Sequence, residues 1–142
     1  MTKKSILVTG AANGIGAAIA RACDEQGYRV GLLDLDEAAL KDTAASMKNA
    51  MVLTGDVTLQ ADVQQALSDF GTPDTVVNNA GIVRFGPLIE QSIEDFVTTV
   101  NVNLIGSYIV AREAAIRMKA ENISGHIINL SSINSVTPGP GA

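Results

Sequence analysis

Thr9-Gly10-Ala11-Ala12-Asn13-Gly14-Ile15-Gly16 lies near the start of the chain, between two segments with different hydrophobic patterns. The apolar run at 5–8 before it predicts a buried strand, and the pattern at 16–21 after it predicts the start of a helix. A glycine-rich turn between a strand and a helix exposes backbone N–H groups to a phosphate, and the helix N-terminus adds about half a positive charge. The sequence therefore predicts a nucleotide-phosphate site at this turn.

The spacing of the glycines separates this turn from other phosphate-binding loops. The chain contains no Gly-Lys pair, which excludes the loop G-x-x-x-x-G-K-[ST]. Gly10, Gly14 and Gly16 follow G-x-x-x-G-x-G instead of the usual dinucleotide pattern G-x-G-x-x-G. Such glycines serve a tight turn, a close approach to pyrophosphate and close packing of helix on strand. An ordinary strand–helix corner is the alternative interpretation.

A second predicted strand, at 29–34, ends in Asp34. Dinucleotide-binding units place an acidic residue about 20 positions after the glycine turn, where it accepts hydrogen bonds from the adenosine ribose. A carboxylate there would also repel a 2′-phosphate. The alternative interpretation of Asp34 is a solvated strand end or a helix cap, because Asp36 and Glu37 follow.

The composition limits the class of protein. A chain of 142 residues has the size of one domain, and we predict a single domain over 1–142. The chain is 46% hydrophobic and has no Trp, which suits an aliphatic α/β core. The net charge of −5 argues against nucleic acid or an anionic membrane surface as a partner.

Cysteine use and hydropathy exclude other classes. Cys23 is the only cysteine, so no internal disulfide can form, and no Cys/His cluster offers a metal site. The apolar run at 6–8 is too short for a secretory signal, and no stretch approaches the roughly 18 apolar residues of a membrane span. We therefore expect a cytoplasmic protein.

Predicted strands alternate with predicted helices along the chain. Strand patterns lie near 5–9, 29–34, 50–54, 74–78 and 125–131, and helical patterns near 36–48, 58–70 and 92–120. Thr58 is a candidate N-cap, and Ser92 with Asp95 resembles a capping box. This alternation predicts an α/β fold, a Rossmann-type doubly wound parallel sheet with helices on both faces.

Polar and small residues follow three of these strands, at the edge where such sheets bind ligands. Asp56 and Val57 follow the third strand, and the Asp56 side chain can reach an adenine edge or cap a helix. Asn78-Asn79-Ala80-Gly81 follows the fourth strand and suits either a bound ligand or an ordinary turn. Ser131-Ser132 follows the fifth strand, where hydroxyls can bind a substrate oxygen or the loop backbone.

Together these motifs resemble the classical branch of the short-chain dehydrogenase/reductase family, over Ser5 to Ala142. Residues 9–16 match the family's TGxxxGIG motif, and residues 78–81 match its NNAG motif. The resemblance implies the first five strands of the family's domain and a nicotinamide cofactor. It implies that the cofactor is bound by Gly10, Asn13, Gly14, Ile15, Gly16, Asp34, Asp56, Val57, Asn79, Ala80 and Gly81.

The resemblance also implies catalytic residues for hydride transfer between the cofactor and an alcohol or ketone. Asn103, in the sequence Asn-Leu-Ile-Gly, is similar to the family's helix asparagine, which supports a water-mediated proton relay. Ser132, the second of the serine pair, aligns with the catalytic serine. Asn101 lacks this context and is predicted to be structural or solvent-facing. His126 precedes the fifth strand, remote from the ligand edge.

The resemblance favours NAD over NADP. Members that prefer NADP place Arg or Lys in the glycine turn or just after the second strand, where this chain has Asn13 and Leu35. A 2′-phosphate would therefore meet the Asp34 carboxylate and no neutralising cation. The resemblance further implies a dimer or tetramer assembled partly through the helix near 103–120.

The family's Tyr-x-x-x-Lys pair would begin near position 145, past the last residue, so we expect a C-terminally truncated chain. Two hypotheses follow. The chain is either the N-terminal portion of an NAD-dependent dehydrogenase or reductase, or a catalytically inactive dinucleotide-binding fragment or module. In both we expect hydride transfer by the 142-residue chain itself near background. The substrate is left open, and Phe85, Pro87 and Leu88 are predicted to pack instead of binding it.

Overall fold

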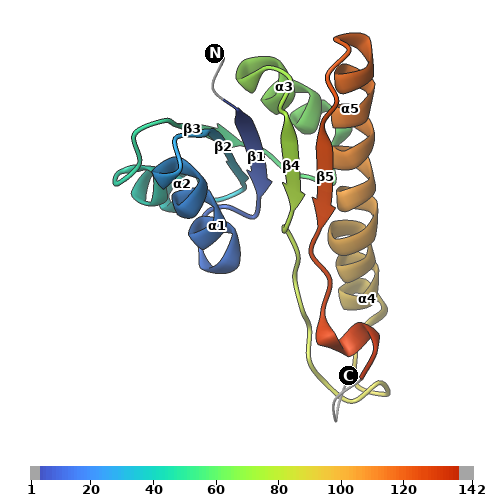
Figure 1. Cartoon of the computed structure of the whole chain (residues 1–142). Helices are drawn as coiled ribbons and strands as arrows, with labels where there is room; N and C mark the ends of the chain where they lie inside the picture. The colour runs from blue at the N-terminus through green and yellow to red at the C-terminus, as the bar shows by residue number, and fades with distance from the viewer. Residues whose placement is uncertain (1–3, 138–142) are drawn as a thin grey trace.

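The computed structural model describes residues 4–137, which contain a five-stranded parallel sheet in the order β3-β2-β1-β4-β5 (Figure 1). The predicted α/β fold is therefore confirmed. The strands are β1 (Ser5–Thr9), β2 (Arg29–Asp34), β3 (Ala50–Thr54), β4 (Thr75–Asn78) and β5 (His126–Asn129). The helices are α1 (Gly14–Glu25), α2 (Glu37–Ala44), α3 (Gln60–Phe70), α4 (Ile93–Val100) and α5 (Ser107–Ala120).

The direction of strand addition reverses between β1 and β4. From β1 the chain adds β2 and β3 on one side, and then places β4 and β5 on the other. Val8 pairs with Leu32 of β2 and with Val77 of β4, so β1 is central in the sheet. The switch point therefore lies between β1 and β4, the place where open α/β sheets bind ligands.

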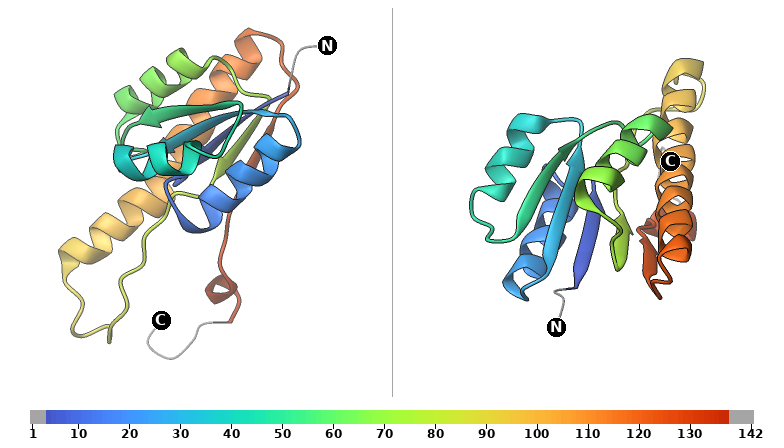
Figure 2. Two further views of the ribbon diagram at one scale, coloured as in Figure 1. Left: turned by 90° about the vertical axis from the view of Figure 1, so that its left-hand side faces the viewer. Right: turned by 90° about the horizontal axis from the view of Figure 1, so that it is seen from above.

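Each face of the sheet has its own hydrophobic core, because successive side chains of a strand point to opposite faces. Leu7 is fully buried against α3 and α5, whereas Ile6 and Val8 face the cluster formed with α1 and α2. In Figure 2, α1 and α2 accordingly lie on one side of the sheet, and α3 and α5 on the other. Helices cover both faces, as predicted.

The predicted helix at 92–120 is interrupted by a π-helical turn at Asn101–Gly106, between α4 and α5. Ser92 caps α4, as expected, because its Oγ accepts a hydrogen bond from Asp95 N at 3.0 Å. The π-helical turn was not predicted, since hydrophobic spacing reports a helical face and not the hydrogen-bond register. Such turns are rare and often lie at functional sites.

Three predicted boundaries are wrong. The fifth strand, predicted to reach 131, ends at Asn129. Thr58 does not cap α3, which begins at Gln60; instead its N–H and hydroxyl both donate to Asp56 Oδ1. The helix predicted to reach 48 ends at Ala44. It stops early because the buried Asp24 carboxylate accepts hydrogen bonds from the backbone N–H groups that follow, those of Lys48 and Asn49.

Helices α3 and α5 are joined by a buried carboxylate. Glu113 of α5 accepts hydrogen bonds from Gln60 and Gln64 of α3, both at 2.9 Å. The hydrogen bond from Gln64, followed by those from Gln60 and the adjacent Arg112, lowers the Glu113 pKa despite the cost of burial. This arrangement fixes α5 against the sheet. Within residues 4–137, no helix combines the length and hydropathy needed to cross a bilayer.

Candidate functional site

The glycine turn packs directly against the loop after β4. Gly10 has a φ of +64°, and a Cβ atom there would lie 2.8 Å from Ala80 Cα and 2.8 Å from Asn79 Nδ2. A Cβ atom at Gly16 would overlap the carbonyl oxygen of Gly10. Both positions therefore require glycine, one for its backbone conformation and both for lack of space.

Hydrogen bonds lock these two loops together at the switch point. Thr9 Oγ1 accepts from Asn79 N at 3.1 Å and from Ala80 N at 3.0 Å. Asn79 Nδ2 donates to the carbonyl oxygens of Thr9 and Gly10, at 3.0 and 3.1 Å. The backbone after β1 is thus held in place by side-chain and main-chain groups of residues 79 and 80.

Asp34 supports the glycine turn from the other side. Its Oδ2 accepts from Ala12 N at 3.1 Å, and its Oδ1 accepts from Leu35 N at 2.7 Å. The helix cap that was the alternative interpretation is provided by Asp36, whose Oδ1 accepts from Ala39 N at 3.0 Å. Asp34 therefore ends β2 with its carboxylate turned toward the glycine turn.

A cleft of about 440 Å³ lies at the carboxyl ends of the strands. A neighbouring hollow of about 400 Å³ covers the glycine turn and shares Gly10, Asp34 and Gly81 with it. Of the eleven residues predicted to bind cofactor, nine line one or both spaces; Gly14 and Gly16 line neither. The cleft is lined by Gly10, Leu33, Asp34, Leu35, Gly55, Asp56, Val57, Thr58, Ala80, Gly81, Ile82, Arg84, Thr98, Asn101 and Val102. The hollow is lined by Gly10, Asn13, Ile15, Asp34, Asn79 and Gly81.

Asp56 and Val57 form the wall of the cleft next to β3. Asp56 Oδ1 accepts two hydrogen bonds from Thr58, one from its backbone N–H at 2.8 Å and one from its hydroxyl at 2.7 Å. Val57 is buried against Gly106, where an added Cβ atom would lie 2.8 Å from Val57 Cγ2. The glycine that closes the π-helical turn thus allows the helix to approach the cleft wall.

Asn103 lies in the π-helical turn and binds the loop after β4. Its Oδ1 accepts from Ile82 N at 2.8 Å, and its Nδ2 donates to Ile82 O at 2.9 Å. The side chain therefore satisfies both backbone polar groups of one residue. Sequence reasoning selected Asn103 for a proton relay but gave no indication of this contact.

Asn78 connects the helix that carries Asn103 with the strand that leads to Ser132. Its Nδ2 donates to Ser107 O at 3.1 Å and to Asn129 Oδ1 at 2.8 Å. The buried Asn78 Oδ1 has no hydrogen-bond partner in the described part of the chain. The carboxamide thus joins α5 to β5 at the carboxyl ends of the strands.

Ser132 lies beyond β5, in a segment that extends away from the sheet (Figure 2). It is exposed, and its Oγ accepts from Asn134 N at 3.2 Å, which begins a short 3-10 turn. Neither Ser132 nor Asn103 lines the cleft or the hollow. His126 begins β5 and is exposed, at the end of the strand opposite the cleft.

Comparison with known proteins identifies the family. The family model described as short chain dehydrogenase matches residues 4–142. The chain belongs to the short-chain dehydrogenase family. The fold agrees, because a short chain dehydrogenase from Bacillus anthracis superposes with a TM-score of 0.91 at 23% identity. That match covers 97% of this chain and 61% of the other.

Relatives of this short-chain dehydrogenase chain are oxidoreductases. An uncharacterized oxidoreductase from Thermotoga maritima is 38% identical over 91% of the chain. An L-rhamnose 1-dehydrogenase (NAD(P)(+)) from Azotobacter vinelandii is 36% identical over 96%, and an L-fucose dehydrogenase from Oryctolagus cuniculus is 38% identical over 92%. The chain spans about half the length of these relatives, namely 53%, 58% and 47%.

The cleft also contains residues that sequence reasoning missed. Thr98 of α4 and Asn101 of the π-helical turn line it; Asn101 is exposed, as predicted, but its place beside the cleft was not foreseen. Arg84 also lines it, a cation that the argument for NAD over NADP from the glycine turn and the end of the second strand did not consider. The available signal was that Arg84 is the only basic residue between Lys48 and Arg112.

Sequence reasoning also misjudged the middle of the loop after β4. Phe85, Pro87 and Leu88 were predicted to pack, but all three are exposed, with 74% of Phe85 and 87% of Leu88 accessible. The loop at 79–92 leaves the sheet with α4 instead of folding back onto it (Figure 2).

Proposed function

We propose that the chain binds NAD(H) along the cleft and hollow, and that it belongs to an enzyme that interconverts an alcohol and a ketone. The observation that carries the proposal is the locked pair of loops at the switch point, with Asp34 beside them. Gly10 lets the glycine turn pack against the loop after β4, because a Cβ atom there would lie 2.8 Å from Ala80 Cα and from Asn79 Nδ2. The residues therefore fit a dinucleotide. Its pyrophosphate would contact backbone N–H groups of the protein, and its ribose would contact a carboxylate.

In this proposal the pyrophosphate lies at the N-terminus of α1. The Asn13 side chain does not cap this helix. Backbone N–H groups of the first turn can therefore bind an anion. Asp34 would accept hydrogen bonds from the adenosine ribose, and Asp56 and Val57 would flank adenine. Ala80 and Gly81 would also contact the dinucleotide, because both line the same cleft as Asp34, Asp56 and Val57.

The chain's catalytic residues in this proposal are Ser132 and Asn103. The nicotinamide, when bound, exchanges hydride with the substrate carbon. Ser132 would hold the substrate oxygen by a hydrogen bond, and Asn103 would support the proton relay. Asn103 binds Ile82 in the loop after β4, and Ser132 follows β5.

The names of the relatives suggest the first substrates to test. Three of them are an L-rhamnose dehydrogenase, an L-fucose dehydrogenase and a D-threitol dehydrogenase. We therefore propose a polyhydroxylated alcohol or sugar as the substrate class. The acidic net charge is consistent with an uncharged or cationic substrate rather than a polyanion.

We also propose that the protein forms a homodimer or homotetramer through the helical segment made of α4, the π-helical turn and α5. Ile93, Leu104 and Tyr108 are exposed there, at 80%, 63% and 63% of their accessible surface. Apolar side chains at helical spacing along one face are typical of an interface between protein surfaces. Sedimentation velocity of wild-type protein and of Leu104→Glu tests this, with a shift toward monomer expected in the variant.

Titration with NADH and NADPH, followed by cofactor fluorescence, tests the central proposal. We expect saturable NADH binding with weaker NADPH binding, and we expect Gly10→Ala to abolish both. Gly27→Ala is the control, because Gly27 also has a positive φ but lies away from the cleft. Absence of NADH binding by the folded wild-type protein would contradict the proposal. Both hypotheses expect near-background turnover by the 142-residue chain, so robust turnover of an alcohol by this chain would contradict that expectation.

A further inference from the structure

Arg84 places a positive charge in the wall of a cleft that is otherwise lined by acidic and uncharged residues. It lies in the loop at 79–92, and it shares the cleft with the carboxylates of Asp34 and Asp56. Thr98 of α4 and Asn101 of the π-helical turn also line the cleft. Among the residues described as lining this cleft, Arg84 is the one cation.

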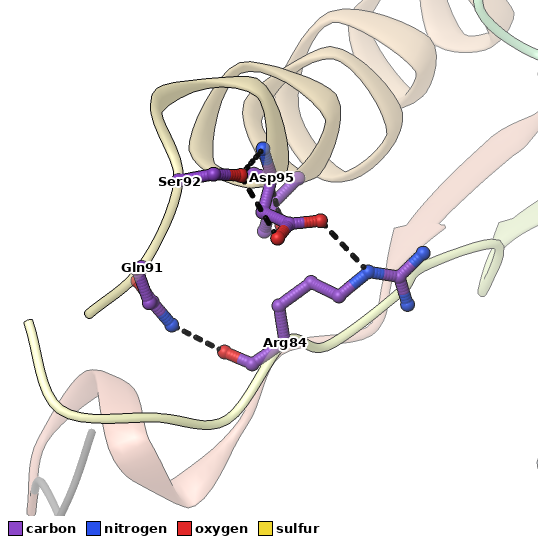
Figure 3. Close-up of polar contacts among 5 residues, drawn as sticks. Arg84, Gln91, Ser92 and Asp95 are labelled. Atoms are coloured by element: carbon purple, nitrogen blue, oxygen red, sulfur yellow. Dashed lines mark hydrogen bonds and ion pairs between the residues drawn. The ribbon is translucent and has the colours of Figure 1, made fainter.

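The guanidinium is held at one nitrogen only. Arg84 Nε lies 3.4 Å from Asp95 Oδ1, in the first turn of α4 (Figure 3). The Arg84 carbonyl oxygen accepts from Gln91 Nε2 at 2.6 Å, and Ser92 Oγ donates to Asp95 Oδ2 at 2.9 Å. These contacts fix the Arg84 backbone and one edge of its guanidinium.

The two terminal nitrogens of Arg84 are left for a ligand. Neither has a hydrogen-bond or ion-pair partner within residues 4–137, and in Figure 3 both point away from Asp95. About half of the side chain is exposed, so the guanidinium lies at the mouth of the cleft and not in its floor. A planar cation in this setting can either bind a phosphate or stack on an aromatic ring.

The composition of the cleft favours stacking. None of the described lining residues is aromatic, so a bound base would find no Phe, Tyr or His to cover it. The carboxylates of Asp34 and Asp56 line the same cleft and oppose a further anion. Adenine is neutral and has a π face, which a guanidinium can cover with its charge over the ring.

We propose that Arg84 stacks on the adenine base and is a specificity-determining residue for adenine dinucleotides. This inference rests on the proposed dinucleotide binding and adds a contact to it. Val57 lines the β3 side of the cleft and Arg84 the side of α4. The Asp95 carboxylate contacts the guanidinium at Nε only, 3.4 Å away, and leaves the face of the group to the base.

Titrations with the whole dinucleotide and with its two halves distinguish adenine stacking by Arg84 from a role in holding the loop or in binding phosphate. The probes are NADH, ADP-ribose, which lacks nicotinamide, and reduced nicotinamide mononucleotide, which lacks adenosine. We expect Arg84→Gln to weaken NADH and ADP-ribose binding roughly three- to tenfold, the range of a partly exposed cation–π contact. We expect binding of the mononucleotide to remain unchanged. Arg84→Lys keeps the positive charge but lacks the planar guanidinium, so it should also weaken NADH and ADP-ribose binding.

Asp95→Asn is the matched control, because it removes the ion pair and keeps the guanidinium. We expect it to change NADH binding less than twofold. Equal losses in Arg84→Gln and Asp95→Asn that extend to the mononucleotide would overturn the inference, because Arg84 would then act only by holding the loop. A loss confined to NADPH would also overturn it, in favour of 2′-phosphate binding.

The inference and the proposed function fail in different ways. Unchanged NADH and ADP-ribose binding in both Arg84 variants, with tight binding by wild type, overturns the inference alone. Absence of NADH binding by wild type overturns the proposed function. Thermal melts by circular dichroism accompany each titration, and Arg84→Lys carries the test if Arg84→Gln destabilises the loop.

Discussion

The carboxamide of Asn103 binds both backbone polar groups of Ile82, at 2.8 and 2.9 Å, across 21 positions of sequence. This pair connects the π-helical turn to the loop that leaves β4. The loop has no regular structure from 79 to 92, and loops of this length within a compact fold are commonly functional. Asn103 therefore fixes the first part of a candidate functional loop.

Asn103→Asp is expected to release this loop. A carboxylate still accepts from Ile82 N but cannot donate to Ile82 O, so one hydrogen bond becomes a repulsive contact. We expect a loss of about 1 kcal/mol in the free energy of unfolding. Hydrogen exchange of the Ile82 amide should accelerate, and Asn101→Asp, two positions away in the same turn, should leave it unchanged. Equal exchange in both variants would contradict this role for Asn103.

Thr9→Val tests the lock between the two loops. The Thr9 hydroxyl is almost fully buried and accepts from the N–H groups of Asn79 and Ala80. Valine has the same shape but leaves both donors without this acceptor, which costs about 1–3 kcal/mol. Denaturant unfolding should show this loss, together with weaker NADH binding.

Thr54→Val is the matched control for Thr9→Val, because Thr54 is an exposed position of β3. We expect its effect to stay within about 0.5 kcal/mol. A similar loss in both variants would mean that the threonine side chain matters for the strand and not for the lock.

Most of the fold followed from local patterns. The strands at 5–9, 29–34 and 50–54 have the predicted bounds, because each is a short apolar run that ends in a turn signal. The glycine spacing, with Asp34 at the end of the second strand, predicted a site at the place where the cleft lies. These signals lie within one βαβ unit, so the sequence carries them at short range.

The missed features depend on contacts between distant segments. Arg84 reaches the cleft because its loop runs beside α4, and no local pattern reports that proximity. The early end of α2 depends on Asp24, which lies more than 20 positions before the residues it binds. The π-helical turn keeps the apolar face of the helix continuous, so hydrophobic periodicity cannot distinguish it from an α-helix.

Gly10→Ala and Gly27→Ala separate backbone strain from steric overlap. Both glycines have positive φ, +64° and +83°, so alanine is strained at either position. Only at Gly10 would the new Cβ atom also meet backbone, at 2.8 Å from Ala80 Cα. We expect Gly27→Ala to cost about 1 kcal/mol and Gly10→Ala distinctly more. Thermal unfolding measures both, and equal losses would show that the loops can move apart.

Asp24 is expected to make stability depend on acid pH. The backbone N–H of Lys48 holds the pKa of the Asp24 carboxyl below its usual value; burial opposes this, and Asn49 adds further hydrogen bonds that lower it. A folded-state pKa below the unfolded value means that the contribution is complete above the unfolded pKa, about 3.9. It is lost as the pH falls through the folded-state pKa.

Asp24→Asn removes this ionisation while keeping the shape of the side chain. We expect the variant to be less stable than wild type at neutral pH, because the amide lacks the charge and one acceptor that bind the N–H groups of Lys48 and Asn49. The difference should shrink as the pH falls below about 4, where the wild-type carboxyl gains a proton. Urea unfolding between pH 7 and pH 3 measures it, with the exposed Asp42→Asn as the control. A difference that stays constant over this range would mean that packing, and not charge, accounts for the effect of Asp24.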